Sequence, residues 1–352
     1  MSPLHSSRSA PLHSGGLVDL QVNGFAGVDF NDATLTADAL DHALHAILQG
    51  GITTCLPTVI TAGIADMAAR LAALDRAVAN SRLGPLMVPG YHLEGPFLNP
   101  GPGFAGCHPP SAMIAPEPAT VARLAAGLRR PILLLTLAAE LPGAEALIRW
   151  LAARGVIAAI GHSDAGAEVV ARAAAAGARL STHLGNGLPQ MLPKLDNPLM
   201  AQLAEDRLAA SFIADGIHLP VPALRAMVRA KGPRRAILVT DAVAAAGAPP
   251  GRYGFAGMAI EGAEDGSVRL PGTRTLAGSA LTLDRAVRNV ASWGIASQSE
   301  AIAMASNAPA ALLVPALRAH GLTLPDNAVE WGGLRVISAH VGEVRVGEVR
   351  VG

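Results

Sequence analysis

Residues 156–164 read VIAAIGHSD, an apolar run that breaks at a histidine, His162. Four other stretches have the same form: LMVPGYHLEG (86–95), ARLSTHLGN (178–186), AASFIADGIH (209–218) and AILVTDA (236–242). Continuous apolar runs are typical of parallel strands that are buried on both faces. Each predicted strand leads to a polar residue at or just past its end, and in chain order these are Glu94, His162, His183, His218 and Asp241.

The rest of the chain alternates such runs with Ala- and Leu-rich helical patterns, which is the rhythm of parallel β/α units. Strands are predicted at 17–23, 52–59, 86–93, 131–137, 156–161, 179–184, 209–214 and 236–240. Helices are predicted at 36–49, 61–80, 115–129, 143–154, 164–176, 220–231, 281–293 and 298–317. This pattern favours an α/β fold with a closed (β/α)8, or TIM, barrel. Catalytic groups of such barrels come from the C-terminal strand ends, so we expect the five polar residues to meet there.

Composition limits the classes of partner. The chain has 352 residues, with 27 Lys and Arg against 27 Asp and Glu, and few aromatic side chains, which gives no support for a nucleic-acid partner. Its start is polar, without the apolar core of a signal peptide, and no run reaches the roughly 20 apolar residues that are needed to span a bilayer. Cys55 and Cys107 form neither a metal-binding spacing nor a disulfide framework. We therefore expect a cytoplasmic protein with no membrane partner.

The predicted organisation is one catalytic barrel over residues 16–320, between a disordered tail, 1–15, and a degenerate C-terminal β segment, 321–352. The segment 250–275 has the turn residues of a hairpin. A Gly- and Pro-rich connection, 94–114, follows the third predicted strand. A loop of that length directly after a strand end is usually functional.

Glu94, His162 and His183 form a candidate metal site, because a catalytic site of the zinc type uses three protein ligands and keeps one position open. Taken singly, each could be a structural residue, since a lone histidine is more often a satisfied core or surface residue. Three possible ligands at the ends of three strands together favour the metal site.

His218 and Asp241 are the candidates for the chemistry beside the metal. His218 could polarise a substrate carbonyl, or it could begin the helix that follows at Pro220. Asp241 could take a proton from water and deliver it to a leaving amine. It could instead cap the segment that follows it. The residues by themselves leave these alternatives open.

Several motifs in this order resemble one family. They are HLEGPF (92–97), IGHSDA (160–165), STHLGN (181–186), IADGIH (213–218), LVTDA (238–242) and LAGSALTL (276–283), with DLQVNGFAGVDFND (19–32) and GITTCLPTVIT (51–61) before them. Over roughly 17–315, the chain resembles the N-acetylglucosamine-6-phosphate deacetylases of the amidohydrolase superfamily. The resemblance implies a metal-dependent enzyme that acts on an amino sugar.

The resemblance also implies roles for single residues. Glu94, His162 and His183 would hold the metal, Asp241 would be the general acid and base, and His218 would contact the sugar and the acyl carbonyl. Asn186 and Gly187, in the HLGNG turn, would meet the phosphosugar. The acyl pocket would be lined by Ala277, Gly278 and Ser279.

Gln21 and Asn23 occupy the place where many relatives carry a His-x-His pair. Amides are poor ligands beside imidazole, so the expectation is one divalent ion per chain. Zinc is the first candidate, with iron, manganese or cobalt as alternatives, because His and Glu sites accept all of them.

The chain departs from the family pattern in three places. Gly187 and Leu188 replace an Ala-Met pair, and Lys194 falls where an Arg would reach the sugar phosphate across a dimer interface. A lysine can hold a phosphate as a point charge but lacks the bidentate fork of arginine. The loop GCHPP keeps His108 as a phosphate contact but has Pro109 in place of an Asn. The resemblance also implies a small β-sandwich before the barrel, which we expect to be missing or vestigial here.

The predicted function is metal-dependent hydrolysis of the N-acetyl group of N-acetylglucosamine 6-phosphate, giving glucosamine 6-phosphate and acetate. The predicted assembly is a homodimer. One alternative keeps the chemistry but takes an unphosphorylated N-acyl amino sugar or another N-acyl amine, which the changes at Lys194 and GCHPP motivate. The other is a sugar-phosphate binding barrel without activity, which would require a lost ligand, and no ligand is visibly lost.

Overall fold

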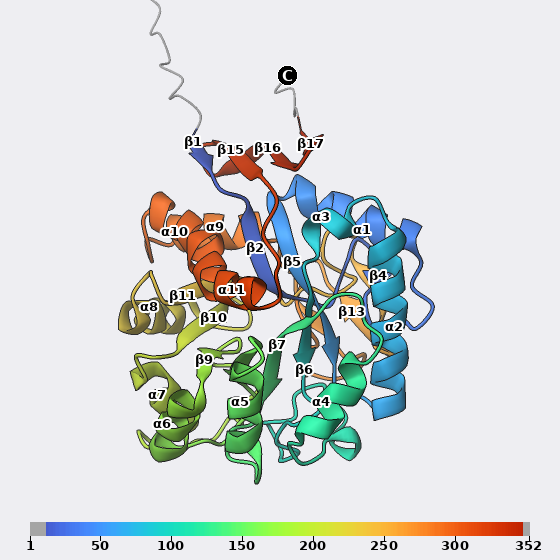
Figure 1. The fold of residues 1–352 in the computed structure, drawn as a ribbon. Coiled ribbons are helices and arrows are strands. Elements are labelled where there is room, and N and C mark those ends of the chain that lie inside the picture. Colours follow the sequence, from blue (N-terminus) through green and yellow to red (C-terminus); the bar gives the residue numbers. More distant parts are fainter. Residues whose placement is uncertain (1–11, 348–352) are drawn as a thin grey trace, which may run out of the picture.

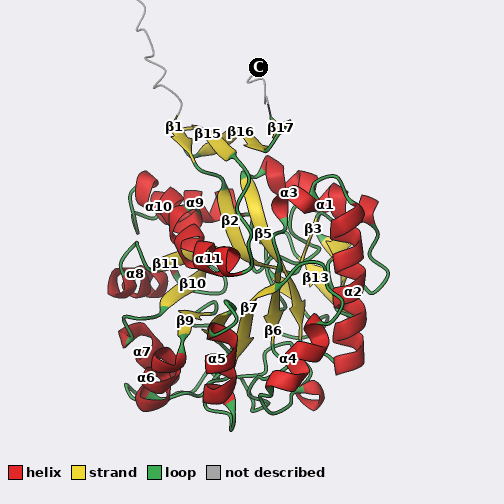
Figure 2. Cartoon of the chain, in the orientation of Figure 1, coloured by secondary structure: helices red, strands yellow, loops and turns green. Residues whose placement is uncertain are grey.

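The computed structural model describes residues 12–347 of the chain. Eight parallel strands form one sheet in the order β11-β10-β9-β8-β7-β6-β5-β2. Their bounds are β2 (Leu17–Val22), β5 (Ile52–Ile60), β6 (Tyr91–Glu94), β7 (Ile132–Leu137), β8 (Ile157–Ile160), β9 (Ala178–Ser181), β10 (Ala209–Ile213) and β11 (Ala236–Val239). Helices surround the sheet (Figures 1 and 2), so the predicted α/β barrel is confirmed.

The helices are amphipathic and pack one buried stripe against the strands. In α1, the buried side chains Leu40, Ala43, Leu44, Ile47 and Leu48 recur at helical spacing. The helix bounds are α1 (Ala37–Gln49), α2 (Ile64–Asn80), α3 (Gly84–Met87), η1 (Pro110–Ala112), α4 (Pro118–Ala125), α5 (Ala144–Ala152), α6 (Ala167–Ala176), α7 (Pro198–Ala204), α8 (Val221–Lys231), α9 (Leu283–Ser292), α10 (Gln298–Ala305) and α11 (Asn307–Ala319).

Three elements differ in kind from the sequence prediction, each for a local reason. Residues 84–87 form α3, not the start of a strand, and the amide of Val88 closes this turn on the carbonyl of Gly84. The single helix predicted at 298–317 is two helices, because the backbone leaves helical geometry at Ser306. The short helix α7 was not predicted, although Pro198 opens it and the Asn197 side chain caps it.

The stretch Gln298–Ala319, which contains α10 and α11, is long and apolar enough to cross a membrane by length and composition. Half of its most apolar window is buried inside the molecule. Leu313 and Leu317 of α11 are among the core residues, so packing against the barrel accounts for the apolar character.

Smaller antiparallel sheets flank the barrel. The strands β1 (Leu12–Ser14), β15 (Asn327–Gly332), β16 (Arg335–Val341) and β17 (Val344–Val346) form one sheet, at the top of Figure 1, and join both ends of the described chain. The second sheet consists of β12 (Gly251–Phe255), β13 (Met258–Gly262) and β14 (Val268–Arg269), which lie within the predicted hairpin segment. A third, two-stranded sheet pairs β3 (Gly24–Phe25) with β4 (Val28–Asp29).

The predicted tail, 1–15, was too long. Leu12–Ser14 pair with β15, and the indole of Trp331 donates to the hydroxyl of Ser14 at 2.9 Å. Residues 1–11 and 348–352 lie outside the described part of the chain. The division into tail, barrel and C-terminal segment otherwise stays a prediction.

Hydrogen bonds between the first and last strands close the barrel. The amide of Asp241 donates to the carbonyl of Gln21 (3.0 Å), and the amide of Asn23 donates to the carbonyl of Ala242 (2.7 Å). Below them Asp19 is fully buried and accepts from the Thr240 hydroxyl (2.5 Å), the Thr240 amide (3.2 Å) and the Gln21 amide (3.3 Å). Asp19 therefore fixes β2 to the end of β11, directly before Asp241.

Replacing Asp19 by alanine should lower the free energy of unfolding by about 2–6 kcal/mol, because the Thr240 and Gln21 amides lose their acceptor and each such buried donor costs about 1–3 kcal/mol. The Thr240 hydroxyl can still donate to the carbonyl of Gln21. Urea unfolding followed by circular dichroism measures this change. Asp196→Ala, which removes an exposed carboxylate, is the control and should stay within about 0.5 kcal/mol of the parent. A loss for Asp19→Ala as small as the control would show that this closure adds no stability.

Candidate metal centre and active site

A cavity of about 120 Å³ lies at the C-terminal mouth of the barrel. Its lining includes all five polar residues that follow the predicted strands: Glu94, His162, His183, His218 and Asp241. They meet because the carboxyl ends of parallel strands share one edge, which in a barrel becomes a ring.

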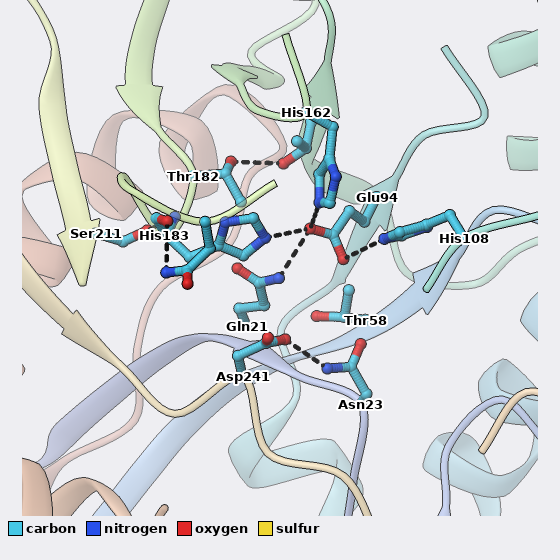
Figure 3. Close-up of polar contacts among 12 residues, drawn as sticks. Gln21, Asn23, Thr58, Glu94, His108, His162, Thr182, His183, Ser211 and Asp241 are labelled. Carbon is cyan, nitrogen blue, oxygen red and sulfur yellow. Dashed lines mark hydrogen bonds and ion pairs between the residues drawn. The ribbon is translucent and has the colours of Figure 1, made fainter. Parts of the chain in front are cut away.

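Glu94, His162 and His183 are close enough to share one metal ion. Their candidate ligand atoms all lie within 4.8 Å of one another, and all three side chains are buried. Nε2 of His183 lies 2.8 Å and Nε2 of His162 lies 3.3 Å from Oε1 of Glu94. Figure 3 shows both rings turned toward this carboxylate.

The surroundings of His162 prepare it as a ligand. Its Nδ1 is 2.6 Å from the carbonyl oxygen of Phe104, which can only accept, so Nδ1 carries the proton. The lone pair is then on Nε2, a buried atom for which the described residues provide no hydrogen bond. A second-shell carbonyl of this kind is the usual partner of a metal-bound imidazole. The donor set therefore fits a divalent cation.

The backbone is strained where these side chains enter the cavity. His162 (φ 52°), His183 (φ 29°) and Asp241 (φ 50°) are three of the five non-glycine residues with positive φ in the described chain. This region is sparsely allowed for L-residues, and strain held in place by the fold gathers at functional sites. Three such residues around one cavity support a functional site independently of the ligand types.

Two amides hold the carboxylates from the first barrel strand. Gln21 donates through Nε2 to Oε1 of Glu94 at 3.1 Å, and Asn23 donates through Nδ2 to Oδ1 of Asp241 at 2.8 Å (Figure 3). Gln21 and Asn23 thus orient existing acids. That this amide pair leaves the site with one metal stays a prediction.

The two acids of the cavity differ in their ionisation. Burial and, next to it, the charge of Glu94 raise the pKa of Asp241 to about 6. Burial also acts to raise the pKa of Glu94, but the imidazoles of His162 and His183 beside the carboxylate outweigh it and hold this pKa well below its usual range. Glu94 is therefore the permanent anion, while Asp241 can bind and release a proton near neutral pH.

Asp215 fixes His218 and was missed in the sequence reading. Its Oδ2 lies 2.6 Å from Nδ1 of His218, and its Oδ1 accepts from the amides of Ile217 and His218, both at 2.8 Å. Nε2 is then the remaining ring nitrogen for a contact in the cavity. The DGIH spacing, an aspartate three residues before the histidine in a Gly-containing turn, was the available signal.

Of the predicted substrate-binding residues, Asn186, Gly187 and Gly278 line the cavity together with His218. Ala277 and Ser279 do not line it. Ala277 packs in a small apolar cluster with Val243 and Ile260, and the hydroxyl of Ser279 donates to the carbonyl of Thr240 at 2.6 Å. Ser279 therefore supports the segment that carries Asp241 rather than facing an acyl group.

One of the two predicted phosphate contacts, His108, lies beside the metal ligands. His108 is buried beside the metal ligands, with Nε2 3.6 Å from Oε2 of Glu94 and its ring edge-on to His162 at 4.7 Å. Burial lowers the pKa of His108 to about 3, so the ring is neutral and a poor anchor for a phosphate. Lys194 is exposed, and its contact with a sugar phosphate across a dimer interface stays a prediction.

Comparison with known proteins gives relatives over most of the chain, although no family model matches. The chain is 34% identical over 308 residues to an N-acetylgalactosamine-6-phosphate deacetylase of Escherichia coli O157:H7, covering 88% of this chain and 80% of that protein. It is also 34% identical over 310 residues to the human N-acetylglucosamine-6-phosphate deacetylase, covering 85% and 73%.

Solved structures give the same result. An N-acetyl-D-glucosamine-6-phosphate deacetylase mutant from Mycobacterium smegmatis, in complex with N-acetyl-D-glucosamine-6-phosphate, has a TM-score of 0.84 and 29% identity, covering 96% of this chain and 87% of that one. An N-acetylglucosamine-6-phosphate deacetylase from Pasteurella multocida has a TM-score of 0.82 and 28% identity, covering 96% and 87%.

Proposed function

This chain belongs to the N-acetylhexosamine-6-phosphate deacetylases, a family of metal-dependent amidohydrolases, and on that premise we propose that it hydrolyses the N-acetyl group of N-acetylglucosamine 6-phosphate. The products are glucosamine 6-phosphate and acetate. The observation that carries the proposal is the buried Glu94–His162–His183 cluster with Asp241 in the same cavity.

The metal ligands, Asp241 and His218 have separate roles in amide hydrolysis. A divalent cation held by Glu94, His162 and His183 would polarise the acetyl carbonyl and acidify water. Asp241, oriented by Asn23, accepts the proton of the attacking water and then delivers it to the leaving amine. His218, held by Asp215 through Nδ1, contacts the sugar or the acyl oxygen with its remaining nitrogen.

Asp241 should give the pH profile an acid limb. Only the carboxylate form accepts a proton, so kcat/KM should fall toward low pH, with a midpoint no higher than the pKa of about 6. A bound cation favours the carboxylate and can only move this midpoint lower. Rates measured from pH 4.5 to 8 test this, with overlapping buffers as a control for effects of the buffer itself. A rate that rises as the pH falls below 6 would exclude Asp241 as the base.

The choice between hexosamines is the finer part of the proposal. The relatives include deacetylases named for N-acetylglucosamine 6-phosphate and for N-acetylgalactosamine 6-phosphate, which differ at the C4 hydroxyl. We assign the gluco sugar from the motif resemblance. Zinc as the metal, a homodimer and a cytoplasmic setting are further parts of this proposal.

Acetate release from three substrates tests the proposed function. N-acetylglucosamine 6-phosphate should have the highest kcat/KM, followed by N-acetylgalactosamine 6-phosphate, with unphosphorylated N-acetylglucosamine far behind. A preference for the galacto sugar would correct only the hexosamine. Equal rates with and without phosphate would favour the alternative substrate class, N-acyl amino sugars without phosphate. No acetate from any of them in metal-loaded protein would refute the proposal.

A further inference from the structure

The hairpin of β12 and β13 supplies part of the wall of the active-site cavity. Phe255, the last residue of β12, lines this cavity together with Ile60, the last residue of β5, and Cys107. Phe255 and Ile60 are buried in one small apolar cluster, and Cys107 packs against it. The cavity therefore has an apolar side that comes from the hairpin and β5.

The tip of the hairpin is a tight turn in a strained conformation. Phe255 pairs with Met258, so that Ala256 and Gly257 form a two-residue turn. Both have positive φ, 52° for Ala256 and 83° for Gly257, as the turns that suit two-residue hairpins require. Positive φ is unfavourable for alanine and persists where surrounding contacts hold it.

Two side chains of the barrel hold both polar backbone groups of Ala256. Oδ2 of Asp29 accepts from its amide at 2.6 Å, and Nη2 of Arg70 donates to its carbonyl oxygen at 3.0 Å. Asp29 ends β4 and Arg70 lies on α2, so each contact crosses from the barrel to the hairpin. Asp29 and Arg70 thus form a hairpin clamp.

The clamp also reaches the end of β5. Oδ1 of Asp29 accepts from the amide of Asn31 at 2.9 Å. The side chain of Asn31 donates to the carbonyl of Thr58 at 2.9 Å and accepts from the amide of Ile60 at 3.0 Å. One carboxylate is therefore connected to both apolar wall residues, to Phe255 through Ala256 and to Ile60 through Asn31.

The clamp lies outside the active-site cavity. Asp29, Asn31 and Arg70 line a separate cavity of about 520 Å³, together with Gly254 and Gly257 of the hairpin. The two cavities share no lining residue among those that the structure describes. An effect of the clamp on a substrate in the active site therefore has to pass through the hairpin or β5.

We propose that Asp29 and Arg70 are positioning residues that set the acyl selectivity of the enzyme, because they hold Ala256 and so keep Phe255 beside Ile60. This inference rests on the proposed function. The active-site cavity is small, about 120 Å³, and a longer acyl chain fits only if its apolar wall moves. The two hydrogen bonds on Ala256 resist that movement. Without them the hairpin tip can shift and admit the longer chain.

The test compares kcat/KM for N-acetyl- and N-butyrylglucosamine 6-phosphate. The parent should prefer the acetyl substrate by at least about tenfold, since one methylene in a hydrophobic pocket changes kcat/KM by about 10–200-fold. Arg70→Met should reduce this preference by about tenfold, mainly through a higher rate on the butyryl substrate. A general loss of folded enzyme would lower both rates equally and leave their ratio unchanged.

Conservative and control variants accompany this measurement. Arg70→Lys can still donate to Ala256 and should recover part of the preference. In Asp29→Asn one acceptor oxygen remains for two amides, so this variant should change the ratio in the same direction as Arg70→Met. Arg76→Met, which removes an exposed arginine of the same helix outside both cavities, should keep the ratio of the parent.

A double variant tests whether Arg70 acts through Phe255. Phe255→Ala removes the wall side chain itself and should reduce the preference on its own. Arg70→Met added to Phe255→Ala should then change the ratio no further, because residues that act through one contact are not additive. Independent, additive effects would show that Arg70 acts elsewhere and would overturn the proposal.

The remaining outcomes separate this inference from the proposed function. An active parent without a preference for the acetyl substrate would refute the inference alone. So would a selective parent whose ratio stays unchanged in both Arg70→Met and Asp29→Asn. A metal-loaded parent that releases neither acetate nor butyrate would refute the proposed function, and the inference with it.

Discussion

Glu94→Gln and His162→Ala should each lose the metal ion and the deacetylase activity together. Glu94 supplies the one carboxylate among the three candidate ligands, and the imidazoles of His162 and His183 beside it favour its charged form. Loss of a ligand should weaken binding by more than the roughly 10–100-fold that loss of an outer-shell partner costs. Elemental analysis after dialysis against a weak chelator, with acetate release on the same sample, measures both effects.

His45→Ala is the matched control, because His45 is an exposed histidine on α1, outside the metal cluster. This variant should keep one equivalent of metal and full activity. Either ligand variant that retains stoichiometric metal would show that the residue it changes is not a ligand. Two equivalents per chain in the active parent would contradict the single-metal prediction drawn from Gln21 and Asn23.

Asp241→Asn should keep the metal and lose turnover. The amide has the shape of the carboxylate and can stay near Asn23, but it accepts no proton from water and has none to return to the amine. The expected fall in kcat is about 10²–10⁴, the usual contribution of a general acid–base group. Acetate release, metal content and the melting temperature should be measured on one preparation, so that a folding defect is recognised.

Asp164→Asn serves as the control, since Asp164 is an exposed aspartate two residues after His162 and does not line the active-site cavity. It should leave turnover unchanged. A metal-free Asp241→Asn protein would make Asp241 a ligand instead of a proton carrier. An active one would remove Asp241 from the mechanism.

The barrel and the convergence of its polar residues could be predicted because both depend on short-range patterns. An apolar run buried on both faces identifies a parallel strand, and the topology of a (β/α)8 barrel then brings every strand end to one mouth. Glu94, His162 and His183 were therefore placed together although they are far apart in the sequence. The break at Ser306 was not predicted, although Ser306, Asn307 and Pro309 are residues that commonly end one helix and begin another.

The contacts of the loops could not be predicted, because they depend on where each loop folds back. The Gly- and Pro-rich 94–114 loop turns inward and buries His108 beside Glu94, whereas the motif alone suggested a phosphate contact. The segment after Asn186 leaves the active-site cavity before Lys194. Arg274 lines the cavity of about 740 Å³ that adjoins the active site, although it follows Asn186 by 88 residues (274 − 186), and no local spacing encodes this proximity.

The most direct test of the central claim, a single metal ion that supports deacetylation, is a metal titration of chelator-stripped protein. Zn²⁺ is added in fractions of an equivalent, and acetate release from N-acetylglucosamine 6-phosphate is measured at each step. Activity should be absent at the start, rise linearly and level at one equivalent per chain. Full activity in stripped protein, or a plateau only at two equivalents, would contradict the claim.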